Sequence, residues 1–274
     1  MSNSRTLAIH VLLAAICVVM ALPLFWMVLT ALKTHDEVYT HPYWWWPSHP
    51  HLTDNIKRLV AAVPFGLYFL NSFVVSSAAT VTDLLFATMA GYALAKFKFP
   101  GQRLFFALVV GTMMVPFIVI LIPEYVIIRS FGWLDTYQGL IAPFAISSLG
   151  IFLMRQAFAR MPDDILDAAR MDGAGEWYIL FRIAMPLNVA PLVSLAILRF
   201  LDEWDSLLWP LVATHNTDMR TMSLGLALLQ DDRYGVDMPV AMTAAMTAII
   251  PIVLLYLFLQ RYVVSSVVEA GVKG

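Results

Sequence analysis

The chain has 274 residues, of which 60% are hydrophobic and 13% charged, and its formal net charge is −2. A soluble globular domain usually has about 45–50% apolar and roughly 25% charged residues, so this composition predicts a membrane protein. The near-neutral charge excludes a basic surface for nucleic acid. The single cysteine, Cys17, excludes an intrachain disulfide framework and a cysteine-based zinc cluster.

Long apolar stretches account for most of the hydrophobic residues. A helix needs about 20 apolar residues to span a bilayer, and unpaired backbone groups in lipid are costly. The first stretch is too long for the apolar core of a signal peptide, so we expect it to be retained. The sequence predicts an all-α polytopic membrane protein with six transmembrane helices, at residues 7–32, 67–95, 104–123, 139–158, 186–212 and 239–262. Pro116 and Pro123 interrupt the third of these spans and Pro251 the sixth, where each could be a bending point for alternating access or a static kink.

The outer loop after the first stretch contains the segment HPYWWWPSHPHL. Its tryptophan, tyrosine and proline residues are typical of a membrane interface. His41, His49 and His51 could instead indicate a metal site, but no carboxylate or cysteine spacing completes a ligand set. We therefore interpret the segment as an interfacial loop and expect no metal.

The second stretch contains polar residues at Asn71, Ser72, Ser76, Thr80 and Asp83. From Ser72 onward their spacing places them on one helical face. An aspartate at membrane depth is costly unless it faces water or a partner, so this face could line a translocation pathway. Helix packing through small polar residues is the alternative. Asp83 is the strongest candidate for a pathway-facing residue.

The distribution of lysine and arginine predicts the orientation. With the N-terminus inside the cell, ten cations lie on the cytoplasmic side and six outside. Both termini and the segment 160–186 are then cytoplasmic. The inner cations are Arg5, Lys96, Lys98, Arg103, Arg155, Arg160, Arg170, Arg182, Arg261 and Lys273, and the outer ones are Lys33, Lys57, Arg58, Arg129, Arg220 and Arg233.

The segment 160–186 is charged and lies between apolar stretches. Pro162 suits the first position of a helix, and the acidic residues after it suit the positive end of the helix dipole. Gly173 is placed to end this helix as a C-terminal cap. A second short helix over 176–184 precedes Pro186, which starts the fifth span. The segment is therefore predicted to be a helix–glycine–helix elbow.

The fifth stretch contains Arg199, Asp202, Glu203, Trp204 and Asp205. Arg199 can reach the carboxylates three and four residues later on the same helical face, which predicts a structural ion pair. The alternative is that the carboxylates and the tryptophan bind a polyol. We favour a structural or gating role.

The elbow resembles the cytoplasmic "EAA loop" of permease subunits in bacterial ABC importers. The similarity extends over essentially all of the chain and is greatest to MalG-type permeases of carbohydrate importers. Two positions depart from the family pattern, because Asp167 replaces the usual glutamate and Met185 the usual leucine. Neither change removes a charge or the proline. The matching residues are Asp167-Ala168-Ala169, Met171 to Ala174, Ile183 and Pro186 in the elbow, and Asn71-Ser72, Tyr92 to Ala95, Phe99-Pro100-Gly101, Gln260-Arg261-Tyr262 and Ala270 to Gly274 elsewhere.

The resemblance implies an ABC type-1 importer transmembrane fold in three parts: the first helix and outer loop (1–66), the permease core (67–262) and a cytoplasmic tail (263–274). It implies that the elbow docks on a cytoplasmic ATPase subunit and that Gly271 and Lys273 of the tail contact the ATPase subunits. The implied partners are a second homologous permease, two ATPase subunits, an extracytoplasmic solute-binding protein and membrane lipid. The implied coupling residues are Asp167, Ala168, Ala169, Asp172, Gly173, Ile183 and Pro186.

The chain has no phosphate-binding loop of the Gly-x4-Gly-Lys-Ser/Thr type. We therefore expect no cofactor on this chain, and ATP and magnesium to be used by the ATPase subunits. The resemblance implies a multi-pass protein of the bacterial inner membrane that imports a sugar or oligosaccharide by alternating access. Glycerol-3-phosphate or a glycerophosphodiester is the alternative solute. An integral membrane enzyme and a passive channel are the alternatives from other classes.

Overall fold

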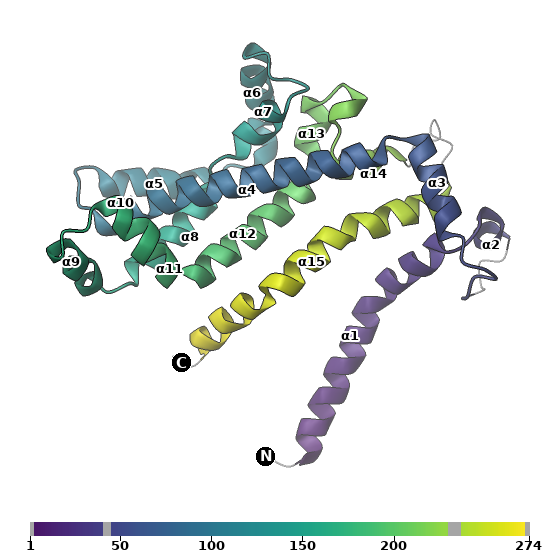
Figure 1. Cartoon of the computed structure of the whole chain (residues 1–274), viewed down its shortest axis with the longest axis horizontal. Helices are drawn as coiled ribbons and strands as arrows, with labels where there is room; N and C mark the ends of the chain where they lie inside the picture. The colour runs from purple at the N-terminus through teal and green to yellow at the C-terminus, as the bar shows by residue number, and fades with distance from the viewer. Residues whose placement is uncertain (1–2, 41–44, 230–236, 272–274) are drawn as a thin grey trace. The chain divides into compact units, whose positions relative to one another are not determined.

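The computed structural model describes residues 3–40, 45–229 and 237–271, and side chains are described from residue 6 to residue 260. Every regular element in these ranges is a helix (Figure 1), which confirms the all-α prediction. The chain divides into two compact units, Met1–Gly66 with Gly225–Ile250, and Leu67–Leu224 with Pro251–Gly274. The candidate residues of the elbow and of the fifth stretch all lie in the second unit.

The first unit begins with α1 (Asn3–Ala31), whose apolar side chains are exposed along most of its length. Val19 and Met20, for example, are 64% and 72% exposed. So much exposed apolar surface is unfavourable in water, and it suits contact with lipid. Asn55 of α3 (Leu52–Ala62) donates hydrogen bonds of 2.9 Å to the carbonyl groups of Ala31 and Lys33, so the end of α1 has polar partners. The unit also contains α2 (His35–Tyr39) and the first part of α15 (Met238–Gly271).

Glu37 forms a capping box with Thr34 at the start of α2. It accepts hydrogen bonds from the amides of Thr34 at 2.9 Å and Ser48 at 2.8 Å, and from the Ser48 hydroxyl. Burial raises the pKa of Glu37, but the hydrogen bonds from Ser48 and Thr34 outweigh it and lower the pKa to about 2. Because the folded-state pKa is depressed, this stabilisation is present above the ordinary value of 4.5 and is lost as the pH falls toward 2.

We therefore expect the amides of Thr34 and Ser48 to lose protection from hydrogen exchange as the pH falls from 4.5 toward 2, after correction for intrinsic rates. Glu37→Gln is the matched control, because it keeps the side-chain shape and cannot titrate. Equal loss of protection in this variant would show that Glu37 is not the group responsible.

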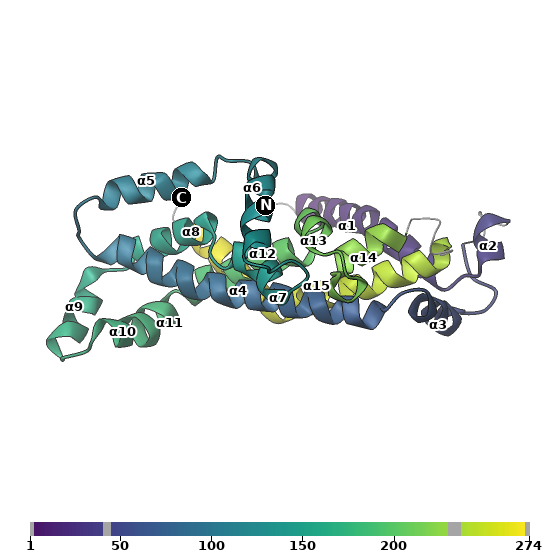
Figure 2. The same ribbon diagram turned by 90° about the horizontal axis from the view of Figure 1, so that it is seen from above.

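The second unit is arranged along α4 (Phe65–Lys96), and Figure 2 shows α8 and α12 beside it. Gly91 of α4 allows α8 to approach closely, since a Cβ there would lie 2.7 Å from the Cβ of Met154. The remaining helices of the unit are α5 (Gln102–Thr112), α6 (Phe117–Ser130), α7 (Tyr137–Ile141), η1 (Ala142–Phe144), α8 (Ser148–Ala159), α9 (Asp163–Met171), α10 (Glu176–Tyr178), η2 (Ile179–Ala184), α11 (Met185–Leu187), α12 (Val189–Trp204), α13 (Leu208–Ala213) and η3 (Thr217–Met219), with most of α14 (Met222–Leu229) in the first unit.

Three of the described helices are long and apolar enough to cross a membrane alone, and they match the first, second and sixth predicted spans. The third, fourth and fifth predicted spans are not single continuous helices. Each is a pair of helices, bent by 100° between α5 and α6, by 44° before α8, and by 84° between α11 and α12. The chain reaches six spans if each bent pair crosses once, so the number of spans stays a prediction.

Local chemistry explains these bends. Pro116 precedes α6 and lacks the N–H group that would continue α5, and Val115 before it is restricted as well. Ser147 starts α8 as an N-cap, with its hydroxyl accepting a hydrogen bond from the amide of Gly150. Asn188 has a non-helical conformation between α11 and α12, and its side-chain amide donates to the carbonyl of Ala184. The interruption predicted at Pro116 is confirmed, whereas Pro123 and Pro251 lie inside α6 and α15. The apolar composition of the fourth and fifth stretches did not predict their bends.

Candidate coupling elbow and solute cavity

The predicted elbow is present in the second unit, and Gly173 is its corner. Gly173 has a φ of +84°, in the left-handed region. Its amide donates to the carbonyl of Arg170, and the amide of Ala174 donates to the carbonyl of Ala169, both at 3.0 Å. This pair of bonds is a Schellman motif, which ends a helix with a fixed change of direction. The prediction of a glycine C-terminal cap is confirmed.

The boundaries of the elbow differ from the prediction at both prolines. Pro162 is the N-cap of α9, one position before the first helical residue, and its ψ of 134° is not helical. The second helix does not end at Ala184. It continues as α11 to Leu187, and its middle part, η2, has π-helical geometry. Pro186 therefore lies inside the elbow, and the helix of the fifth stretch begins at Val189.

The predicted coupling residues lie on the exposed part of this elbow. Leu166 and Ile179 are fully buried and anchor α9 and the π-helical segment in the core. The side chain of Asp167 is 63% exposed and accepts a hydrogen bond from Arg170 at 2.8 Å. Of the other coupling residues, Ala168, Asp172, Gly173 and Pro186 are exposed, and Ala169 and Ile183 are half-buried.

Glu176 connects the two helices of the elbow to each other and to α4. Its carboxylate accepts hydrogen bonds from Arg170 Nε at 2.7 Å and from the hydroxyl of Tyr92 at 3.0 Å. The bond from Arg170 is the main reason that the pKa of Glu176 is lowered. Lys96, four residues after Tyr92, donates to Asp163 Oδ1 at 2.6 Å and lowers the pKa of that carboxyl. Sequence reasoning did not assign roles to these residues, because the contacts join distant parts of the chain.

The polar residues at the start of α4 are buried. Asn71 donates to the carbonyls of Asp218 and Arg220 at 2.8 and 2.9 Å and accepts from the hydroxyl of Tyr137 at 2.7 Å. Ser72 accepts a hydrogen bond of 2.7 Å from the amide of Met222. Both residues therefore hold the segment before α14 against α4. A pathway role for them stays a prediction.

Asp83 is fully buried and is the polar partner of two other elements. It accepts hydrogen bonds from the amide and the hydroxyl of Ser147, the latter at 2.8 Å. The oxygen that accepts from the hydroxyl, Oδ2, is also 3.1 Å from Arg199 Nε. These contacts match the packing alternative for this face of α4, since they connect α4 to α8 and α12.

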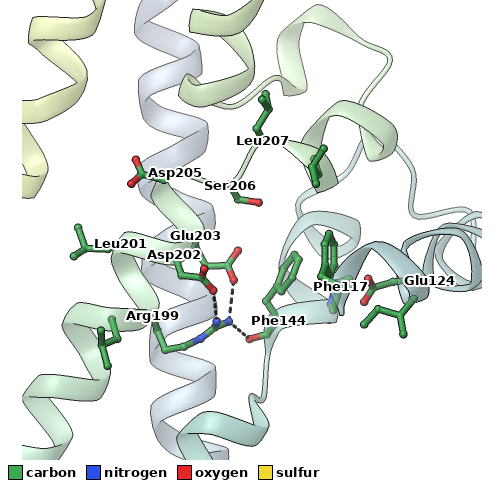
Figure 3. Close-up of a pocket in the computed structure, with 14 residues that line it drawn as sticks. Phe117, Glu124, Phe144, Arg199, Leu201, Asp202, Glu203, Asp205, Ser206 and Leu207 are labelled. Carbon is green, nitrogen blue, oxygen red and sulfur yellow. Dashed lines mark hydrogen bonds and ion pairs between the residues drawn. The ribbon is translucent and has the colours of Figure 1, made fainter. Parts of the chain in front are cut away.

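The predicted ion pair of Arg199 is confirmed. Figure 3 shows its guanidinium directed toward Asp202, Glu203 and the carbonyl of Phe144, at 2.7, 2.8 and 3.3 Å. With Asp83, three carboxylates surround this one cation. The side chains of Arg199 and Glu203 are 8% and 3% exposed, whereas that of Asp202 is 69% exposed. Asp83 is distant in sequence, so spacing alone could not identify it as the third partner.

A cavity of about 720 Å³ lies beside this ion-pair cluster. Asp205 lines it and Trp204 is not among its lining residues. The predicted pathway or gate role of both residues stays a prediction. The ring of Trp204 is buried, stacked on Phe200 and in edge contact with Phe69. The lining residues are Phe117, Ile120, Glu124, Pro143, Phe144, Leu198, Arg199, Leu201, Asp202, Glu203, Asp205, Ser206, Leu207 and Leu208.

Glu124 is a cavity residue that sequence reasoning missed. It lies on α6, across the cavity from Arg199 (Figure 3), and its Oε2 atom is buried with no hydrogen-bond partner among the described residues. The available signal was a carboxylate directly after Pro123, at the end of an apolar stretch.

Two predicted residues fall at or beyond the limits of the description. Gly271 is the last residue of α15, and Lys273 lies outside the described residues. His41 of the outer loop also lies outside them. The predicted contact of the tail with ATPase subunits stays a prediction.

The fold matches that of a chain in a bacterial ABC transporter involved in the import of the acidic polysaccharide alginate. The TM-score is 0.82 at 24% sequence identity, and the match covers 96% of this chain and 99% of that chain. The fold is therefore that of an ABC importer permease. The family described as "binding-protein-dependent transport system inner membrane component" matches residues 84–269, and the chain belongs to this family.

The chain is also similar to permeases named for two kinds of solute. The arabinooligosaccharides transport system permease protein AraQ of Bacillus subtilis is 37% identical over 76% of this chain and 73% of its own length. AraQ of Halalkalibacterium halodurans is 36% identical over 83% and 81%. The sn-glycerol-3-phosphate transport system permease protein UgpE of Yersinia pestis is 33% identical over 98% of both chains. The chain is thus similar to permeases for a neutral and for an anionic solute.

Proposed function

We propose that this chain is the transmembrane permease subunit of an ATP-driven, binding-protein-dependent importer for a sugar or oligosaccharide. It forms half of the translocation pathway, together with a second, homologous permease. Two ATPase subunits drive it from the cytoplasm, where both of its termini lie, and a solute-binding protein delivers the solute outside. It crosses the bacterial inner membrane six times, and the elbow at 160–186 receives the movement of the ATPase subunits. The family membership and the fold of the elbow support this proposal.

The choice of a neutral solute rests on one observation, the carboxylates that already surround Arg199. It is the one cation among the described residues that line the cavity, and three carboxylates of the same chain already surround it. A phosphate there would also meet Glu124 and Asp205. Two like charges 4 Å apart repel by about 4 kcal/mol at an effective dielectric constant of about 20. Neutral sugars avoid this repulsion, and their hydroxyl groups can donate hydrogen bonds to carboxylates.

Glycerol-3-phosphate is the second candidate, because UgpE matches this chain over almost its whole length. The partner permease would then have to supply the cations that bind the phosphate. The two candidates differ in the charge of the solute, so one assay can separate them.

The test uses the complete transporter in proteoliposomes, with its own solute-binding protein and internal ATP. We expect a neutral oligosaccharide to stimulate ATP hydrolysis and to be taken up, and glycerol-3-phosphate to do neither. Stimulation by glycerol-3-phosphate alone would contradict the choice of a neutral solute. Uptake without ATP would contradict the importer mechanism and indicate a channel. Chemical conversion of a solute by the chain without ATPase subunits would indicate an enzyme.

A further inference from the structure

We infer that Tyr92 and Lys96 are the positioning residues that fix the elbow to α4, so that the elbow and α4 move as one body during transport. This inference rests on the proposed function, in which the elbow receives the force. In this proposal the force from the ATPase subunits passes from the elbow to α4 before it reaches α12.

The first connection joins α4 to α10. The hydroxyl of Tyr92 donates to Glu176 Oε2, while Arg170 of α9 donates to Glu176 Oε1. The carboxylate is thus held between a hydroxyl of α4 and a guanidinium of α9. The ring of Tyr92 is buried and makes edge contacts with Phe158 and Phe97, with ring centroids 5.5 and 5.7 Å apart. A ring packed in this way has little freedom to follow the carboxylate if the elbow moves independently.

The second connection joins α4 to α9, one helical turn further along. Lys96 Nζ donates to the carbonyl of Met161 and to Asp163 Oδ1, both at 2.6 Å. The lysine side chain is 4% exposed and the aspartate side chain 74% exposed. The ammonium group is therefore buried beneath the start of α9, where its two bonds replace water. Charge-assisted hydrogen bonds of this kind are stronger than neutral ones.

The same end of α4 is also packed closely against α8. Gly91 admits the backbone of Met154 and Arg155, since a Cβ there would lie 2.8 Å from the Arg155 nitrogen and 3.0 Å from the Met154 carbonyl carbon. Arg155 Nε donates to the carbonyl of Leu94 at 3.3 Å. Tyr92, Met154, Phe158, Leu166 and Ile179 belong to one buried cluster, so α4, α8 and both helices of the elbow share a core. Close-packed interiors have low compressibility and transmit strain.

The elbow also continues into α12. The chain passes through the π-helical segment η2 and then bends by 84° at Asn188. The side chain of Asn188 keeps the freed carbonyl of Ala184 hydrogen-bonded at 2.9 Å. Leu195 of α12 belongs to the same buried cluster as Tyr92, so α12 is packed on this core as well.

The test is Tyr92→Phe in the complete transporter, which removes only the hydroxyl. Because a hydrogen bond to a charged group contributes about 1.5–3 kcal/mol, the equilibrium between a fixed and a released elbow should shift by about tenfold or more. We expect the number of solute molecules imported per ATP hydrolysed to fall severalfold, with the ATPase subunits still bound. Tyr256→Phe, which removes a hydroxyl from an exposed ring on α15, is the matched control and should keep the wild-type ratio.

A second readout measures the connection directly. Cysteines placed at Ala93 and Trp177, after replacement of Cys17, should form a disulfide more slowly in the Tyr92→Phe background if the elbow is released. Lys96→Met should lower the transport ratio as well, and Lys96→Arg should restore part of it. An unchanged ratio and unchanged cross-linking in Tyr92→Phe would overturn the inference and leave the proposed function intact. Failure of the wild-type transporter to import any sugar would instead overturn the proposed function.

Discussion

Gly173→Pro is expected to abolish coupled solute uptake while the chain still inserts into the membrane. Proline fixes φ near −65°, whereas this position needs +84°. It also removes the N–H group that bonds to the carbonyl of Arg170. The Schellman motif is lost, α10 leaves α9 at a different angle, and the exposed face of the elbow no longer fits an ATPase subunit. The measurement is ATP-driven uptake, together with co-purification of the ATPase subunits.

Two alanine variants distinguish the effect of the backbone angle at the elbow from the effect of an added methyl group. A Cβ added at Gly173 or at Gly175 would meet no atom within 4 Å. Gly175 has a φ of −75°, which alanine adopts freely, whereas a left-handed alanine costs about 1–2 kcal/mol. Gly173→Ala should therefore reduce uptake in part, and Gly175→Ala should leave it unchanged. Wild-type uptake by Gly173→Pro would contradict the role of the elbow as the coupling element.

The elbow could be predicted from sequence because its determinants are local. Gly173 lies two residues after the end of α9, and acidic residues occupy the first turn of that helix. A helix cap, a turn and a helix start each depend on a few neighbouring residues, so a short stretch of sequence is enough to predict them. The ion pair of Arg199 with Asp202 and Glu203 was accessible for the same reason, since it lies within two turns of one helix.

The bend angles and the tertiary partners could not be predicted in the same way. Pro116 indicates a break in the third stretch, but the sequence does not predict the angle of 100° between its two helices. The polar pattern around Asp83 fits both a pathway and a packed interface, and its contacts with Ser147 and Arg199 could not be read from that pattern. The role of Glu176 depends on Tyr92, a residue far away in sequence. These contacts join residues that are far apart in the sequence, and their spacing follows no pattern that a single sequence could reveal.

The second large effect is expected for Asp83→Ala. The variant removes a fully buried carboxylate that holds α8 and α12 to α4, and it leaves Arg199 with one of its three charge partners missing. Removing one partner of a buried ion pair typically costs about 3–5 kcal/mol. Because Arg199 keeps two other carboxylates, we expect a loss at the lower end of this range, about 3 kcal/mol. We expect a lower free energy of unfolding in detergent and reduced uptake, with the ATPase subunits still bound.

Asp202→Ala is the matched control, because Asp202 binds the same guanidinium at 2.7 Å but its side chain is 69% exposed. An exposed ion pair contributes less than about 1 kcal/mol, so this variant should unfold almost like the wild type. If Asp83 instead faced the solute, its loss would change uptake without changing stability. Reduced uptake at unchanged unfolding free energy in Asp83→Ala would therefore assign this residue to the translocation pathway. A large loss of stability confined to Asp83→Ala would assign it to the packing of α4 against α8 and α12, since the two variants remove carboxylates from the same arginine and differ in burial.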